Sequence, residues 1–172
     1  MALGPTSEFS SSVAELKKWQ SAVESEAIPL TENHGIHMVD AMLNGEHFVL
    51  GFDTGASAIT LPAEVAEKLS MIPGEQDPTV QMQLADGNLI EGKQMTLKSV
   101  RVGRFTLSDV SCIVLQKGLH DAPSILGGSF LNHFIVKLDP GAKELHLTQL
   151  KEETPAKLAR PVLKSAPPAD GN

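Results

Sequence analysis

The stretch that decides the fold reads Phe48-Val49-Leu50-Gly51-Phe52-Asp53-Thr54-Gly55-Ala56-Ser57. An apolar run with phenylalanine at positions 48 and 52 is typical of a buried strand. The strand ends in a carboxylate, a small hydroxyl and a glycine, and Gly55 permits backbone angles and close approaches that are closed to other residues. The sequence therefore predicts that Asp53 is presented at the rigid end of a strand.

A chance Asp-Thr-Gly tripeptide would be an ordinary loop with an Asx-type turn. The flanking sequence favours a larger arrangement. Residues 59–61 (Ile-Thr-Leu) resume a strand, and residues 124–127 (Ser-Ile-Leu-Gly) form a second apolar strand end. Residues 128–134 then fit a short helix.

Residues 50–57 and 124–127 resemble the two motifs of the retropepsin-like aspartic peptidases. This is the single-domain group of clan AA, which includes bacterial gag-polyprotein-type aspartyl proteases. Its first motif is an apolar pair, Asp-Thr/Ser-Gly and then Ala or Ser, and its second is apolar-apolar-Gly. The resemblance implies that the second strand end crosses beside the catalytic loop. The resemblance spans about residues 36–150. It implies an all-β fold, a retropepsin-like closed β-barrel with short helices, here with an added N-terminal helix.

Length and composition suit one domain with tails, because 172 residues can bury a core without disulfides or metal. A net charge of −7 argues against a nucleic-acid partner, which would need clustered Lys and Arg. No apolar run reaches the roughly 20 residues that span a bilayer, and no signal peptide is evident. We expect a soluble chain without a membrane segment, and its compartment stays open.

The N-terminal residues predict an amphipathic helix over 10–24, with Ser12 and Glu15 in a capping box. This helix is either a dimer contact or regulatory arm, or a helix packed on the back of the domain. The tail is rich in Pro, Ala and Lys, a composition that does not order itself. We therefore expect an arm over 1–30, the peptidase domain over 31–150 and a disordered tail over 151–172.

Turn signals between the apolar runs predict successive hairpins. Asn44-Gly45 is the strongest of them, and it separates two strands within residues 36–58. The second hairpin, over 79–97, turns at Ala85-Asp86-Gly87-Asn88, and the third turns at Gly103. A short helix is expected over 63–69, because Pro62 suits a helix start. Closely spaced strands of this kind indicate an all-β barrel or sandwich.

In the resembled family, the hairpin after the catalytic strand is a flap that folds over bound peptide. The hairpin over 79–97 has the matching place in the order, although the pattern alone also fits an ordinary surface hairpin. The chain has no tyrosine, so closure over substrate would use backbone hydrogen bonds and aliphatic contacts. The resemblance implies these substrate-binding residues: Ala56, Ser57, Leu84, Ala85, Asp86, Gly87 and Ile125.

A single Asp-Thr-Gly implies a homodimer, because pepsin-like enzymes carry two such loops in one chain. The implied catalytic residues are Asp53, Thr54 and Gly55. Two Asp53 carboxylates, one per subunit, would activate a water to hydrolyse a polypeptide, with no cofactor. Residues 56–57 lack the nearby second acidic residue of retroviral enzymes. The alternative is a catalytically silent fold that serves as a dimerisation or peptide-binding module.

The last predicted strand, residues 144–150, has no later partner in the sequence. It either pairs with a second subunit or closes the barrel within one subunit. Other chemistries find less support. His34 and His37 fall on opposite faces of an extended segment, so no metal is expected. Cys112 fits a strand residue, and Ser129 lacks the spacing of a nucleophile elbow.

Overall fold

The computed structural model describes residues 11–17, 22–84, 86–119 and 122–150. They form mostly β-strands and few short helices, which confirms the all-β prediction. Residues 24–149 are one compact unit, and the helical residues 11–17 fall outside it. The helices within residues 24–149 are α2 (Ala63–Lys68) and α3 (Gly128–Leu131). The strands are β1 (Val23–Pro29), β2 (Thr31–Asn33), β3 (Ile36–Leu43), β4 (Glu46–Phe52), β5 (Ile59–Leu61), β6 (Thr79–Gln83), β7 (Leu89–Val102), β8 (Phe105–Leu115), β9 (Ile125–Leu126), β10 (Ile135–Asp139) and β11 (Glu144–Leu150).

Eight strands form one sheet in the order β2-β3-β4-β9-β5-β8-β7-β6. An additional pairing joins β3 to β7, through Met42 with Arg101 and Leu43 with Val100. Because β3, β4, β9, β5, β8 and β7 are neighbours in that order, the extra pairing closes them into a ring of hydrogen-bonded strands. Each strand of this ring has a partner on both sides, so none of the six is an edge strand.

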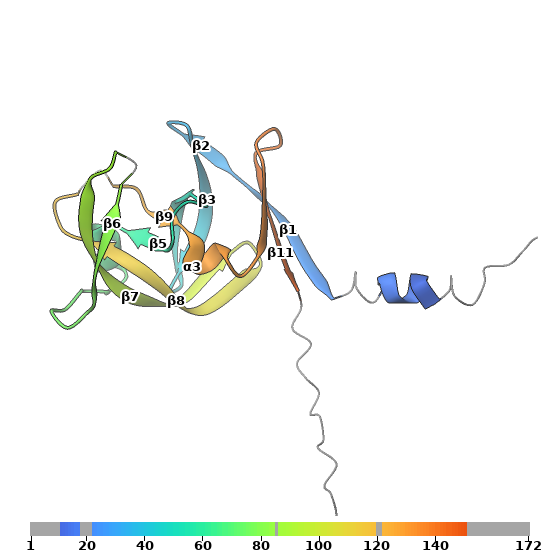
Figure 1. Cartoon of the computed structure of the whole chain (residues 1–172), viewed down its shortest axis with the longest axis horizontal. Coiled ribbons are helices and arrows are strands. Elements are labelled where there is room, and N and C mark those ends of the chain that lie inside the picture. Colours follow the sequence, from blue (N-terminus) through green and yellow to red (C-terminus); the bar gives the residue numbers. More distant parts are fainter. Residues whose placement is uncertain (1–10, 18–21, 85, 120–121, 151–172) are drawn as a thin grey trace, which may run out of the picture. The chain divides into compact units, whose positions relative to one another are not determined.

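The three predicted hairpins are confirmed. Asn44 and Gly45 both have positive φ, +50° and +88°, as the two-residue turn between β3 and β4 requires. β6 pairs with β7 around the turn at residues 84–88, and β7 pairs with β8 around Gly103. Figure 1 shows the β6–β7 hairpin on one side of the domain and the β1–β11 strands on the other.

The inward side chains of the ring form one apolar core. Leu50 of β4, Ile59 of β5 and Leu126 of β9 are fully buried, so the strands around Asp53 stand on packed side chains. Each such side chain contributes about 1.5–3 kcal/mol by leaving water. Phe130 of α3 also is fully buried, with its ring 5.0 Å from that of Phe134. The core thus gives the end of β4 a rigid base.

The last strand is not an unpartnered edge. β11 lies between β1 and β10 in a three-stranded sheet, and its Leu145 and Leu147 are fully buried. The Ser25 and Thr148 hydroxyls, on β1 and β11, are 2.9 Å apart. Of the two alternatives for residues 144–150, the structure therefore has pairing within one subunit, although in a three-stranded sheet. A strand from before the domain's first hairpin supplies the pairing, and the edges of this sheet are β1 and β10.

The N-terminal helix is shorter than predicted. Residues 11–17 are helical, residues 18–21 lie outside the described part of the chain, and β1 already begins at Val23. The prediction of a helix to residue 24 was wrong at this end, because pairing with β11 takes residues 23–29 into a sheet. Residues 1–10 and the predicted tail over 151–172 also lie outside the described residues.

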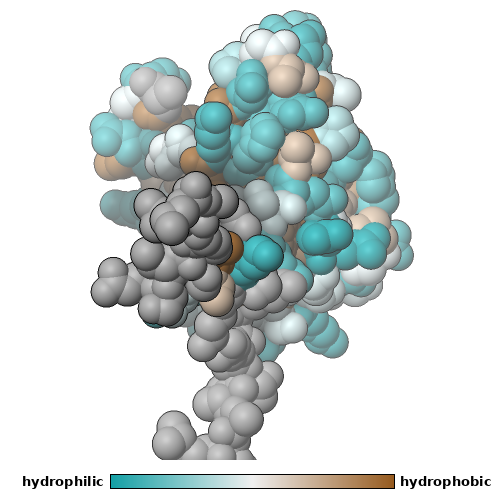
Figure 2. All heavy atoms as spheres, turned by 90° about the vertical axis from the view of Figure 1, so that its right-hand side faces the viewer, coloured by the Kyte–Doolittle hydropathy of each residue, from teal (hydrophilic) through white to brown (hydrophobic). Residues whose placement is uncertain are grey.

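The surface of the described residues is mainly polar. On the face seen in Figure 2, hydrophilic residues dominate and the apolar areas are small and separated. Single exposed apolar side chains such as Val49 of β4 and Ile135 of β10 are ordinary on a protein surface. None of the helices within the described ranges has the length and apolar character needed to cross a membrane.

Candidate active site

Asp53 directly follows β4, where that strand pairs in parallel with β9. The Gly51 N–H donates to the Ser124 carbonyl at 2.8 Å, and the Asp53 N–H donates to the Leu126 carbonyl at 3.3 Å. The two predicted strand ends therefore lie side by side, as expected. A Cβ at Gly51 would come 3.1 Å from the Ile125 side chain, so a glycine here lets Ile125 cover the strand end.

The Asp53 side chain is exposed to solvent and held by its own loop. Its Oδ1 accepts the Gly55 N–H at 2.8 Å. Its backbone carbonyl accepts the Ala56 N–H at 3.4 Å. Thr54 and Gly55 are exposed as well. One carboxylate oxygen is thus fixed by the turn, while the side chain as a whole faces outward, where a second carboxylate or a water molecule has access.

One backbone group and one side chain of the β9–α3 segment hold the loop after Asp53 in place. The Gly128 N–H donates to the Ala56 carbonyl at 2.8 Å. The Ile59 N–H donates to the Ser129 hydroxyl oxygen at 2.9 Å. Both ends of the loop over 53–58 are therefore tied to the same short segment, which limits how far Asp53 can move.

Gly127 is the tightest point of this contact. A Cβ there would come 2.3 Å from the Ala58 carbonyl oxygen and 2.9 Å from that of Ala56. Both are backbone atoms, which cannot rotate away as a side chain would. The loop and the β9–α3 segment can approach this closely only because residue 127 is a glycine.

Gly127→Ala is expected to lower the free energy of unfolding by about 2–3 kcal/mol, because the loop over 53–58 must move to admit the methyl group. Urea denaturation at a fixed protein concentration measures the change. Gly74→Ala is the matched control, since the atom nearest to its Cβ would be Asp77 Oδ2 at 3.6 Å. The control should change stability by no more than about 0.5 kcal/mol. Equal effects of the two substitutions would contradict the tight contact.

The β6–β7 hairpin carries the predicted flap residues at its tip. The described hydrogen bonds of the tip run within the hairpin: the Leu84 N–H donates to the Asn88 carbonyl at 2.8 Å, and the Asn88 N–H to Asp86 Oδ1 at 3.0 Å. Gly87 has a φ of +87°. Leu84 is exposed, and Ala85 lies outside the described residues. The loop over 53–57 and Ile125 are thus brought together, whereas the tip forms a separate group.

Sequence reasoning missed a pocket of about 500 Å³ between this hairpin and the residues that follow β8. One wall is the start of β7 with Gln81 of β6, and the other is residues 116–119. Residues 116–119 resemble an ordinary loop between a buried strand and the Ile125 motif, so their sequence does not indicate a pocket. The pocket depends on pairings between distant segments, which local patterns do not encode.

The other candidate chemistries have structural explanations. Ser129 accepts a backbone hydrogen bond from Ile59, so its hydroxyl ties α3 to β5. Cys112 is buried in β8, where desolvation raises the pKa of its thiol to about 12 and keeps it protonated. His34 lies in a turn and His37 in β3. Across the described ranges, no three His, Cys, Asp or Glu side chains gather in a way that could hold a metal ion.

Comparisons with known proteins agree with this geometry. The chain is 26% identical in sequence to a crystal structure of a retropepsin-like aspartic protease from Rickettsia conorii, with a TM-score of 0.58, and the match covers 74% of this chain and 93% of that one. An uncharacterised protein in the cobV 5′ region of Sinorhizobium sp. is 33% identical over 92 residues, which are 54% of this chain but only 39% of that protein. A family model described as gag-polyprotein putative aspartyl protease matches residues 39–133. Since that match spans more than half of the chain and includes both strand ends, the protein belongs to this family of gag-polyprotein putative aspartyl proteases.

Proposed function

We propose that the chain is an aspartic endopeptidase whose site forms when two copies bring their Asp53 carboxylates together. The observation that carries this proposal is the Asp53 carboxylate itself. It is exposed, bonded at one oxygen to the Gly55 N–H, and set on a loop tied to β9 and α3. A rigid, outward-facing carboxylate in this family is suited to meet its symmetry mate.

The proposed reaction is the hydrolysis of a peptide bond by a water held between the two carboxylates. Two carboxylates a few ångströms apart cannot both ionise cheaply, so the pair shares one proton. The ionised carboxylate takes a proton from the water, and the protonated one gives its proton to the substrate carbonyl oxygen. The water oxygen bonds to the carbonyl carbon and gives a gem-diol. The carboxyl group that took the water's proton then gives it to the amide nitrogen while the other carboxylate takes a proton from one hydroxyl, and the C–N bond breaks to give an acid and an amine. No covalent enzyme intermediate forms.

The remaining predicted residues have roles around this pair. Thr54 hydrogen-bonds across the dimer axis and fixes the two loops to each other, and the Gly55 backbone receives substrate. Ala56, Ser57 and Ile125 line the site from below, because they flank the strand end that carries Asp53. The hairpin tip, residues 84–87, covers the peptide from above. The test is hydrolysis of a mixed peptide library from acidic to neutral pH.

The hairpin tip is expected to be mobile in the free protein and ordered by ligand. The tip bonds mainly to itself and exposes Leu84 and Leu89, so little buried surface holds it. Hydrogen exchange at residues 82–84 and 86–90 should slow by about tenfold when a peptide inhibitor occupies nearly all chains. The turn at residues 44–45 serves as the internal control. Slow exchange in the free protein, unchanged by inhibitor, would rule out a flap.

A further inference from the structure

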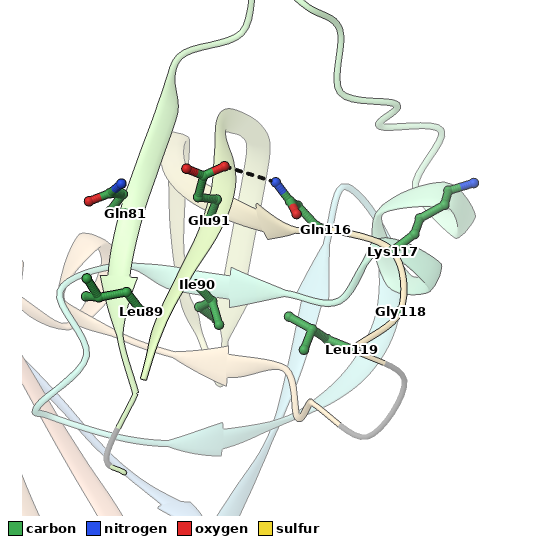
Figure 3. A pocket seen from close by; sticks show the side chains of 8 residues that line it. All are labelled: Gln81, Leu89, Ile90, Glu91, Gln116, Lys117, Gly118 and Leu119. Carbon is green, nitrogen blue, oxygen red and sulfur yellow. Dashed lines mark hydrogen bonds between the residues drawn. The ribbon is translucent and has the colours of Figure 1, made fainter. Parts of the chain in front are cut away.

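The pocket between the β6–β7 hairpin and the residues after β8 has two chemically different parts (Figure 3). Ile90 and Leu119 face each other across it and supply apolar surface. Gln81, Glu91 and Gln116 supply polar groups. A side chain with a long aliphatic stem and a polar end matches this division, because its stem can pack on apolar groups while its end meets polar ones.

The charge in the pocket is negative. Gln116 Nε2 donates to Glu91 Oε2 at 3.3 Å across the two walls, so the amide oxygen of Gln116 is left as an acceptor on the same side as the carboxylate. Lys117 is the basic residue of the lining, but Figure 3 shows its side chain directed away from the pocket. Its Nζ lies 2.5 Å from Glu67 Oε1, and this hydrogen bond raises the pKa of Lys117. Its charge is therefore engaged with Glu67.

One segment of the chain joins a wall of the pocket to the candidate active site. The connection after β8 begins at Gln116 in the pocket wall and ends at Ser124, whose carbonyl accepts the Gly51 N–H two residues before Asp53. The opposite wall is the hairpin proposed to cover substrate. A peptide that runs beneath this hairpin, as the proposed function requires, would lie beside the β7 wall of the pocket.

We propose that the pocket takes a lysine or arginine side chain of the polypeptide substrate and that Glu91 selects it. The inference rests on the proposed peptidase function, since it places a peptide beneath the hairpin. The aliphatic stem packs on Ile90 and Leu119. The cationic end donates hydrogen bonds to the Glu91 carboxylate and the Gln116 amide oxygen, and both groups accept them without a competing cation in the pocket.

Cleavage of a peptide library tests the selection. Peptides with Lys or Arg at one fixed position from the cut bond should be cleaved about fivefold faster than those with Gln, as for one exposed ion pair. Glu91→Gln should remove this preference, and Glu91→Lys should reverse it toward acidic peptides. Glu46→Gln removes the same charge at the β3–β4 turn, outside the pocket, and should keep the preference. Cleavage without any basic preference, or a preference unchanged in Glu91→Gln, would overturn the proposal.

A binding measurement separates this inference from the proposed activity. Fluorescence anisotropy of labelled peptides with Asp53→Asn protein needs no hydrolysis. Basic peptides should bind about fivefold more tightly than their Gln counterparts, and adding Glu91→Gln should abolish the difference. If no peptide is cleaved but this difference is found, the peptidase function fails and the pocket assignment stands. Equal binding of both peptides, or no binding of either, would overturn the pocket assignment whatever the cleavage result.

Discussion

We expect Asp53→Asn to abolish peptide hydrolysis, with a rate at least about 10³-fold below that of the wild type. The amide neither takes a proton from water nor shares one with its symmetry mate, so both general base and general acid are lost together. The exposed side chain lies outside the core, so the variant should fold. Cleavage of a mixed peptide library, followed by mass spectrometry of the products, measures the loss.

The matched control is Asp40→Asn. Asp40 is an exposed aspartate on β3, where its Oδ1 lies 2.8 Å from His47 Nε2, and it has no part in the proposed site. It should retain wild-type activity. Wild-type hydrolysis should be strongest at mildly acidic pH, because the pair works only while it holds one proton. Hydrolysis that survives unchanged in pure Asp53→Asn would end the proposed mechanism.

The features that the sequence predicted correctly are those with local chemical causes. Asn44-Gly45 adopts positive φ at both residues, which specifies a two-residue turn wherever it occurs between strands. The approach of Asp53 to residues 124–127 was predicted from the family motif, and the structure shows that it needs a glycine at position 127. A Cβ at Gly127 would meet backbone atoms at 2.3 Å. Requirements of this kind, on a backbone angle or on the space beside one Cα atom, belong to single residues.

The features that sequence reasoning missed depend on contacts between distant segments. Residues 23–29, Val-Glu-Ser-Glu-Ala-Ile-Pro, show no strict alternation of polarity and Val23 also fits a helical period, so only pairing with β11 makes this segment a strand. The same pairing makes β11 a central strand. The pocket at Glu91 and Gln116 likewise needs β6, β7 and the end of β8 to be in register first. A short stretch of sequence does not determine which distant strands pair with it.

The pairing of β11 within the chain bears on the proposed dimer. The sequence left two alternatives for residues 144–150, pairing with a second subunit or closure within one subunit, and β11 has partners on both sides within the chain. The free backbone edges of this sheet belong to β1 and β10, and Ile135 of β10 has 71% of its surface exposed. The dimer that we propose does not depend on β11, because it rests on the chemistry of the proposed reaction. One exposed carboxylate cannot be base and acid for the same bond at once.

Mixing wild-type chains with Asp53→Asn chains should therefore lower the activity of the wild type. If the site needs one Asp53 from each subunit, a mixed dimer has one carboxylate and is inactive. With equal amounts of the two chains and free exchange, about half of the activity per wild-type chain remains, and with a ninefold excess of the variant about one tenth remains. A titration of peptide cleavage against the ratio of the chains measures this fall.

Dilution gives the matching test without a variant. Below the dissociation constant of the dimer, doubling the total protein should raise cleavage about fourfold, because the dimer concentration follows the square of the chain concentration. An unrelated protein added in equal mass controls for crowding and surface loss, and should leave the activity per wild-type chain unchanged. Sedimentation at the assay concentration then relates activity to the fraction of dimer. An active chain that sediments only as a monomer, and that excess Asp53→Asn does not inhibit, would refute both the dimer and the shared pair of carboxylates.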